Sequence, residues 1–299
     1  MRSLLACLMF VCLVLGSLTG AFSPAFGGSD TLTQDESLLT GENGKIVAQK
    51  KMSLWTSKEV DIFKVTYKSD ELLVTGYVTQ PIKEGKYPLI VYCRGGNLER
   101  YMLTKNSFKG YLDVFGEDFI VVASQLRGND GGKGTQDYAG KDVDDILNIY
   151  ELGKSLPNFN GEVYMYGISE GGVGVYLGLT KGIPAKAAVV ISGVADLAEW
   201  YKRETRIKGS DSPVLKLNKK QIQERNPLEA ASKIRCPILI ADAGDDKNVD
   251  PNLHGKKMEA ALKASGVEVQ REFFPNGGHV LGNMGRKNTD LVLAWFKKH

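Results

Sequence analysis

The five residues Gly167-Ile168-Ser169-Glu170-Gly171 constrain the fold of this chain more than any other segment. They follow a strand-like run, Glu162 to Tyr166, and they open a helix-like run that ends at Leu179. A turn this tight between a strand and a helix has no room for side chains at its two glycine positions, and it raises the serine at its tip. The segment therefore predicts a buried strand that ends at an exposed serine hydroxyl above a helix N-terminus.

Strand-like and helix-like runs alternate on both sides of this turn. The strand-like runs are 60–67, 72–80, 89–93, 119–123, 163–166, 187–191, 238–241 and 267–274, and the helix-like runs are 143–156, 171–179, 258–264 and 291–298. Several of the strands are apolar throughout, as expected of strands that are buried on both faces, and the first two are expected to pair antiparallel around Ser69-Asp70. The alternation predicts a mostly parallel, doubly wound α/β sheet, in which ligands bind at the carboxyl ends of the strands.

The first 27 residues are typical of a targeting segment. Arg2 gives a basic start, residues 4–18 form an almost uninterrupted apolar run, and the small residues Ala25 and Gly27 follow. This three-part pattern predicts a signal peptide and a secreted or periplasmic protein. The alternative is that the segment stays in place as an N-terminal membrane anchor.

The remaining chain is predicted to form one domain of ordinary size. Residues 28–58 are expected to form a surface arm, and residues 59–299 the α/β domain. The alternation is interrupted only over residues 197–234, which we expect to be a helical insertion that covers the site as a lid, with its many basic side chains on a solvated face.

Composition argues against several classes of partner. Without Arg2, 37 Lys and Arg residues stand against 35 Asp and Glu residues, a net charge of about +2 that does not indicate a nucleic-acid partner. No later segment has the apolar length of a membrane span, so no stable membrane partner is expected. Three histidines and the two cysteines outside the signal segment, Cys93 and Cys236, offer no ligand cluster for zinc, and no cofactor is predicted. Both cysteines are expected to be free, buried thiols at opposite ends of the strands.

A Gly-x-Ser-x-Gly turn between a strand and a helix is the nucleophile elbow of α/β-hydrolases, and Ser169 then needs a base. Three histidines are available. His299 is the last residue, and His254 is expected to be exposed among Lys and Gly residues. His279 follows Asn276-Gly277-Gly278 directly after the strand that ends at Phe274, where the base belongs. We therefore expect His279 to be the base.

The acid that orients this histidine should follow the strand 238–241, because α/β-hydrolases place it between the serine and the histidine. Four carboxylates lie there. Asp242 is too near the strand, and Asp250 is expected to cap the following helix. Asp245 and Asp246 both lie on the loop crest, and their positions alone do not separate them.

The developing oxyanion needs two hydrogen-bond donors. One is expected to be the backbone N–H of Glu170, directly after the serine. The other should come from the loop Arg94-Gly95-Gly96-Asn97, where Gly95 or Gly96 lets the backbone approach the substrate. Arg127, which follows the next strand, is expected to structure its own loop.

The chain resembles the catalytic domain of the prolyl oligopeptidase family of serine peptidases over roughly residues 60–299. The resemblance is carried by 94–96, 126–128, 131–134, 142–147, the elbow 167–172, 246–249 and 278–279. It implies an α/β-hydrolase fold and peptidase activity. In that family the acid falls in an Asp-x-x-Val motif, which implies Asp246 as the acid, with Ser169 and His279 completing the catalytic residues.

Three features depart from the family pattern. Arg94 stands where the family has His or Tyr, so a backbone N–H at Gly95 or Gly96 must serve as the donor, and Asp242-Ala243 stands where its acid loop begins His-Gly. Residues 28–58 are too few to form the family's β-propeller. We therefore expect a secreted serine peptidase that forms an acyl-enzyme on a peptide or ester small-molecule substrate. Carboxylic-ester hydrolysis by the same residues is the alternative, and a non-catalytic binding protein with this fold is a further one.

Overall fold

The computed structural model describes residues 41–52, 59–99, 101–104, 115–284 and 286–299, all within the unit Leu32–His299. The predicted signal peptide, 1–27, and the first part of the predicted arm, 28–40, lie outside the described residues. None of the helices in the described part of the chain has the length and apolar character needed to cross a bilayer.

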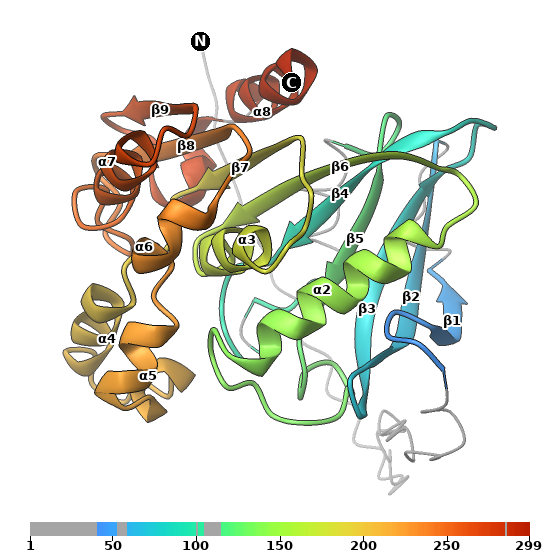
Figure 1. Ribbon diagram of the computed structural model, residues 1–299, viewed down its shortest axis with the longest axis horizontal. Coiled ribbons are helices and arrows are strands. Elements are labelled where there is room, and N and C mark those ends of the chain that lie inside the picture. The colour runs from blue at the N-terminus through green and yellow to red at the C-terminus, as the bar shows by residue number, and fades with distance from the viewer. Residues whose placement is uncertain (1–40, 53–58, 100, 105–114, 285) are drawn as a thin grey trace, which may run out of the picture. The chain divides into compact units, whose positions relative to one another are not determined.

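The described strands form one nine-stranded sheet in the order β1-β2-β3-β5-β4-β6-β7-β8-β9 (Figure 1). Their bounds are β1 Ile46–Lys51, β2 Val60–Ser69, β3 Leu72–Pro81, β4 Tyr87–Cys93, β5 Ile120–Ser124, β6 Phe159–Ile168, β7 Ala187–Ile191, β8 Ile238–Ala243 and β9 Val269–Phe274. The first three strands join the sheet antiparallel, and β5, β4, β6, β7, β8 and β9 run parallel. The prediction of a mostly parallel, doubly wound sheet is confirmed.

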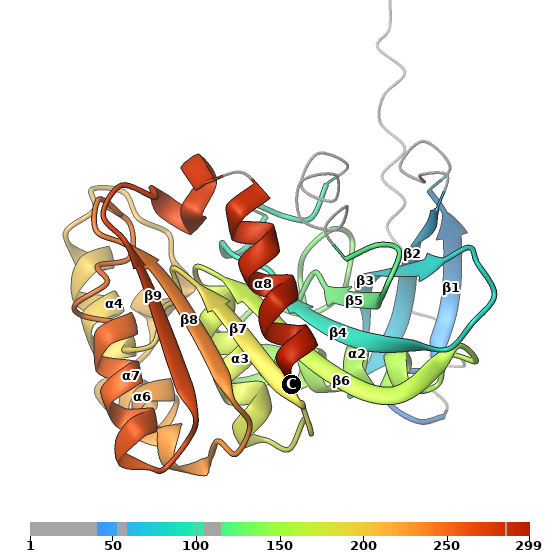
Figure 2. The same cartoon turned by 90° about the horizontal axis from the view of Figure 1, so that it is seen from above.

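Helices cover both faces of this sheet. They are α2 Lys141–Lys154, α3 Gly171–Thr180, α4 Leu197–Thr205, α5 Lys219–Glu224, α6 Pro227–Ala230, α7 Gly255–Ala264 and α8 Arg286–Lys298, with short 3-10 turns at 213–216, 231–233 and 279–284. Alternate residues of β7 separate the two cores: Ala188 and Val190 pack with α2, α3 and α7, whereas Val189 and Ile191 pack with α8. Figure 2 shows α8 on the side of the sheet opposite α3.

The strand order reverses between β4 and β6, and this reversal positions the site. From β4 the chain crosses to β5 on one side, and it then returns to β6 on the other side of β4. The segments that follow β4 and β6 therefore diverge from neighbouring carboxyl ends, which is where doubly wound sheets bind their ligands. Those segments hold Gly95, Gly96 and Ser169.

Two sequence-based boundaries are corrected. The predicted arm contains strand β1, which pairs with β2 at the sheet edge; its side chains are mostly exposed, so it lacks an apolar pattern. The helix after β8 begins at Gly255, with His254 at its N-cap, whereas Asp250 accepts a hydrogen bond from the backbone of Asn252 in the preceding turn.

Both cysteines are buried and free, as predicted. Cys93 ends β4 at the carboxyl edge of the sheet, and Cys236 lies two residues before β8 at the opposite edge. Burial raises the pKa of the Cys236 thiol to about 12, and it raises that of Cys93 further. Neither thiol has thiolate character at neutral pH.

Candidate active site

Ser169 occupies a strained turn between β6 and α3. Its φ of 52° lies in the left-handed region, which is costly for a residue other than glycine. A side chain at Gly171 would lie 2.1 Å from the carbonyl oxygen of Cys93, and one at Gly167 would lie 2.6 Å from the carbonyl oxygen of Gly171. The backbone N–H of Ser169 donates to Ile191 of the next strand. These contacts hold the serine at the tip, as the motif predicts.

Ser169, His279 and Asp246 form one hydrogen-bonded chain. Ser169 Oγ lies 3.0 Å from His279 Nε2, and His279 Nδ1 lies 2.8 Å from Asp246 Oδ2 and 3.1 Å from its Oδ1. Because the carboxylate contacts Nδ1, it favours the tautomer with the proton there, and Nε2 is left to accept a proton from the serine.

Asp246 and Asp245 have different partners. Asp246 accepts the backbone N–H groups of Asn248 and Val249 as well as the histidine. Burial alone would raise the pKa of Asp246, but the hydrogen bonds from His279 and from these two amides hold it below its ordinary value. Asp245 instead accepts the backbone N–H of Gly278, and it braces the loop that carries the histidine.

The two predicted oxyanion donors face the same cavity. Neither the N–H of Glu170 nor that of Gly96 finds an acceptor among the described residues. Gly95 and Gly96 line a cavity of about 600 Å³ together with Ser169 and His279. A side chain at Gly95 would lie 3.2 Å from the Cβ of Ser169, so any larger residue there would require the loop or the serine turn to shift by a few tenths of an ångström.

Arg94 is buried and holds this loop, residues 94–98, from beneath. Its guanidinium donates to the carbonyl oxygens of Gly95, Gly96, Leu98 and Gln125. Burial lowers the pKa of Arg94 to about 10, which leaves it charged at neutral pH. Arg94 thus binds only carbonyl groups of the loop, and the N–H of Gly96, which has no acceptor among the described residues, stays available to a substrate oxygen in the cavity.

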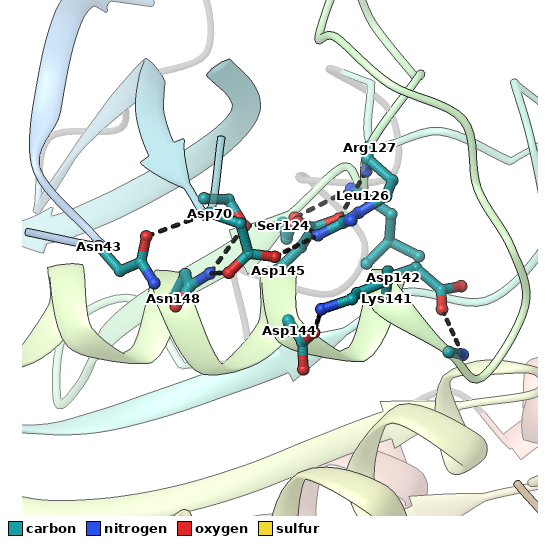
Figure 3. A network of polar contacts seen from close by, with 12 residues as sticks. Asn43, Asp70, Ser124, Leu126, Arg127, Lys141, Asp142, Asp144, Asp145 and Asn148 are labelled. Carbon is teal, nitrogen blue, oxygen red and sulfur yellow. Dashed lines mark hydrogen bonds and ion pairs between the residues drawn. The ribbon is translucent and has the colours of Figure 1, made fainter. Parts of the chain in front are cut away.

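Arg127 also has a structural position, as predicted. Its guanidinium donates twice to the fully buried Asp145 of α2, at 3.0 Å and 2.8 Å, and once to Asp70 at 3.1 Å, and its backbone N–H donates to Asp145 at 2.7 Å. Figure 3 shows these groups together with Asn148, which also contacts Asp70. The network attaches the start of the loop 125–140 to α2. Near the other end of this loop, Gln136 and Tyr138 line a second, small cavity beside Glu170.

The structure contradicts the expected exposure of His254. Its side chain is 3 % exposed, and its Nδ1 accepts the backbone N–H groups of Ala195 and Asp196 at 3.3 and 3.2 Å. Burial lowers the pKa of His254 to about 4. His254 is a buried, neutral group at the N-cap of α7 that binds the backbone just before α4, and it lies outside the chain of Ser169, His279 and Asp246.

The insertion, residues 197–234, is helical, and its first part lines the large cavity. Trp200, Arg203, Glu204 and Ile207 belong to that lining. The sequence analysis did not predict the partners of the Glu170 side chain, which include Trp200. The one feature of the sequence that could have indicated them was an acidic residue inside a tight turn that is expected to be buried. Within the described ranges, no three His, Cys, Asp or Glu side chains lie close enough together to hold a metal ion.

Comparisons with known proteins relate this chain to serine peptidases. The model of the prolyl oligopeptidase family matches residues 106–299. An uncharacterized peptidase of Bacillus subtilis, YtmA, is 26% identical over 259 residues, which cover 84% of this chain and 99% of that protein. Dipeptidyl aminopeptidase BIII of Pseudoxanthomonas mexicana is 27% identical over 211 residues, covering 64% of this chain and 30% of that protein.

Solved structures share the fold. An acylaminoacyl peptidase of Pyrococcus horikoshii superposes with a TM-score of 0.63 at 21% identity, and 81% of this chain covers 42% of that chain. An acetyl xylan esterase from Paenibacillus sp. R4 superposes with a TM-score of 0.63 at 14% identity, covering 88% of this chain and 91% of that one. The prediction of an α/β-hydrolase fold is confirmed, and this chain spans less than half of the peptidase chain.

Proposed function

This chain belongs to the prolyl oligopeptidase family of serine hydrolases, and we propose that it cleaves peptide bonds through an acyl-enzyme on Ser169. The observation that carries the proposal is the hydrogen-bonded chain from Ser169 Oγ through His279 to Asp246. A serine hydroxyl becomes nucleophilic when a neighbouring base takes its proton, and the base needs a third group to orient it.

In the proposed reaction, Ser169 Oγ attacks the acyl carbonyl while His279 Nε2 takes the hydroxyl proton. Asp246 stabilises the imidazolium that forms. The N–H groups of Glu170 and Gly96 hold the negative oxygen of the tetrahedral intermediate. The intermediate collapses when His279 returns the proton to the leaving group. Water then hydrolyses the acyl-enzyme by the same proton transfers in reverse order.

Ester hydrolysis is the second candidate. It is supported by the acetyl xylan esterase, which this chain matches over 91% of its length, against 42% for the acylaminoacyl peptidase. The same serine, histidine and donors serve amide and ester bonds, and the two differ in the leaving group. Two substrates that share one acyl group and differ in the leaving group, an amine or an alcohol, therefore separate the candidates.

Labelling with a fluorophosphonate tests the nucleophile. We expect one adduct per chain by intact mass, on the wild type and not on Ser169→Ala, with both proteins folded by circular dichroism. An adduct that persists in Ser169→Ala would refute the assignment of the nucleophile. A folded wild type that takes no adduct would favour a non-catalytic binding protein.

Matched acyl p-nitroanilide and p-nitrophenyl ester substrates test the bond that is cleaved. A peptidase turns over both, and the ratio of their kcat/KM values reports the acylation step. Turnover of the ester alone, across a series of acyl groups, would assign the chain as a carboxylic-ester hydrolase.

We propose that the protein is exported by its N-terminal segment, on the pattern of Arg2, the apolar run and the small residues near Gly27. Intact mass of the protein recovered from the extracellular or periplasmic fraction should correspond to a chain that begins close after Gly27. Full-length mass together with membrane association would show instead that the segment is retained as an anchor.

A further inference from the structure

The side chain of Glu170 is buried directly behind the serine. It is 9 % exposed, and its Oε1 accepts hydrogen bonds from Asn97 Nδ2 at 2.9 Å, Trp200 Nε1 at 3.1 Å and the Tyr138 hydroxyl at 3.3 Å. A buried carboxylate is retained only where such donors compensate for its lost hydration. The Gly-x-Ser-x-Gly motif leaves the residue after the serine open, so the motif does not account for a buried carboxylate at Glu170.

The three donors come from separate segments of the chain. Asn97 lies in the loop after β4, Tyr138 in the loop 125–140, and Trp200 on α4 of the insertion. One carboxylate oxygen therefore joins these three segments to the first residue after the serine. Asn97 Nδ2 also lies 3.3 Å from the hydroxyl of Ser212, which gives these residues a second link to the insertion beside that of Trp200.

The hydrogen bond from Asn97 to Glu170 joins the two segments that carry the proposed oxyanion donors. Glu170 supplies one proposed donor through its backbone N–H, and Asn97 directly follows Gly96, which supplies the other. The spacing of the two donors thus depends on the bond between these two side chains. The other hydrogen bonds of the loop join Arg94 to its carbonyl groups and the N–H of Leu98 to Gln136, and neither set links Gly96 to Glu170.

We propose that Glu170 is a positioning residue whose carboxylate, through Asn97, sets the separation of the two oxyanion donors. The inference rests on the proposed function and deepens it. Stabilisation of an oxyanion is realised in the transition state, so loss of the brace lowers kcat and leaves KM nearly unchanged.

The chemistry of the partners distinguishes a carboxylate from an amide at this position. Glu170 Oε2 is buried and has no hydrogen-bond partner among the described residues. Burial raises the pKa of the Glu170 carboxyl, and the hydrogen bonds from Asn97 and Tyr138 oppose that rise. Gln in its place keeps the acceptor at Oε1, but it puts an N–H₂ group where no described acceptor lies. Glu170→Gln should therefore retain more activity than Glu170→Ala.

The experiment compares Glu170→Ala, Glu170→Gln and Asn97→Ala, alone and as the double variant Glu170→Ala/Asn97→Ala. We expect kcat for the p-nitrophenyl ester to fall about 100-fold in Glu170→Ala, with KM within about 3-fold, in line with the loss of one oxyanion donor. Glu170→Gln should recover about 10-fold of that loss. The double variant should be close to the worse single variant, because both changes remove one interaction.

A pair of hydroxyl deletions supplies the matched control. Tyr138→Phe removes a donor to Glu170, whereas Tyr176→Phe on α3 removes a buried hydroxyl that has no hydrogen-bond partner among the described residues. We expect Tyr138→Phe to lower kcat several-fold and Tyr176→Phe to leave it unchanged. Equal effects of the two would show a general response to repacking and overturn the inference.

Labelling separates failure of this inference from failure of the proposed function. All variants should still reach one fluorophosphonate adduct per chain, with Glu170→Ala and Asn97→Ala about 100-fold slower than the wild type. The brace would be overturned if these variants were labelled at the wild-type rate or if they changed KM alone. It would also be overturned if the losses of kcat in the two single variants multiplied in the double variant. A wild type that takes no adduct and turns over no ester would overturn the proposed function, and the brace with it.

Discussion

The buried His254 should make the stability of this protein fall between neutral and mildly acidic pH. In the folded state its Nδ1 accepts two backbone N–H groups. A proton on Nδ1 would point at the hydrogens of these two groups and would remove both hydrogen bonds. Burial lowers its pKa to about 4, whereas an unfolded histidine titrates near 6.5. The unfolded state therefore takes up a proton that the folded state refuses. The stabilising contribution is complete above pH ~6.5 and is lost as the pH falls toward about 4.

The magnitude follows from the difference of about 2.5 pKa units, at about 1.4 kcal/mol per unit. The total is about 3–4 kcal/mol. Relative to pH 7.5, linkage gives a loss of about 1 kcal/mol at pH 5.5 and about 2–3 kcal/mol at pH 4.5. Other groups act in the opposite direction, since burial raises the pKa of Asp242 to about 6. The effect must therefore be measured against a variant.

His254→Asn is the matched variant, because its amide oxygen occupies the place of Nδ1 and accepts hydrogen bonds but does not titrate in this range. Urea unfolding at pH 7.5, 5.5 and 4.5 gives the free energy of unfolding for both proteins. We expect the wild type to lose about 2–3 kcal/mol more than His254→Asn between pH 7.5 and 4.5. Parallel pH profiles for the two proteins would refute the reasoning.

Four further substitutions test other parts of the structure. Asp246→Asn should lower kcat by about 10⁴-fold, because the wrong histidine tautomer would face the serine. Asp245→Asn affects the hydrogen bond to Gly278 and should lower kcat by about 10-fold. Steady-state kinetics in which Asp245→Asn is the slower variant would contradict this assignment. Arg127→Met should destabilise the fold by about 3–5 kcal/mol in urea unfolding, because it leaves Asp145 buried and unpaired, and a loss under about 1 kcal/mol would argue against the network. Gly171→Ala should cost about 3 kcal/mol, since its Cβ would meet the carbonyl oxygen of Cys93; wild-type stability would show that the turn can relax.

The sheet was predictable because most of its strands are buried on both faces. Runs such as Leu89–Cys93 and Ala187–Ile191 are apolar throughout, and they have no stable place outside the centre of such a sheet. Strand β1 was missed because it forms one edge and exposes most of its side chains, so its residues carry neither an apolar run nor an alternation. Propensity alone does not mark such a strand, since pairing with β2 decides its conformation.

The site was predictable where backbone position alone fixes a role. Ser169 and His279 follow strands directly, so chain order and strand ends suffice to place them. Asp245 and Asp246 lie on one crest, and their positions alone do not separate them. The Asp-x-x-Val motif implies Asp246, and the path of the loop shows that Asp246 contacts the histidine and Asp245 the glycine before it. The burial of His254 and the partners of Glu170 depend on segments that are distant in sequence, and no local pattern carries that information.

The position of β9 at the edge of the sheet has a consequence for how activity is lost. Among the described strands, β9 pairs only with β8, its side chains are half-exposed or exposed, and His279 follows it. Ser169 instead follows β6, which is paired on both sides. Edge segments open at a lower free energy than central strands, and they form separate cooperative units in hydrogen exchange. The protein can thus cease to turn over substrate while its central sheet, and the serine on it, remain protected from exchange.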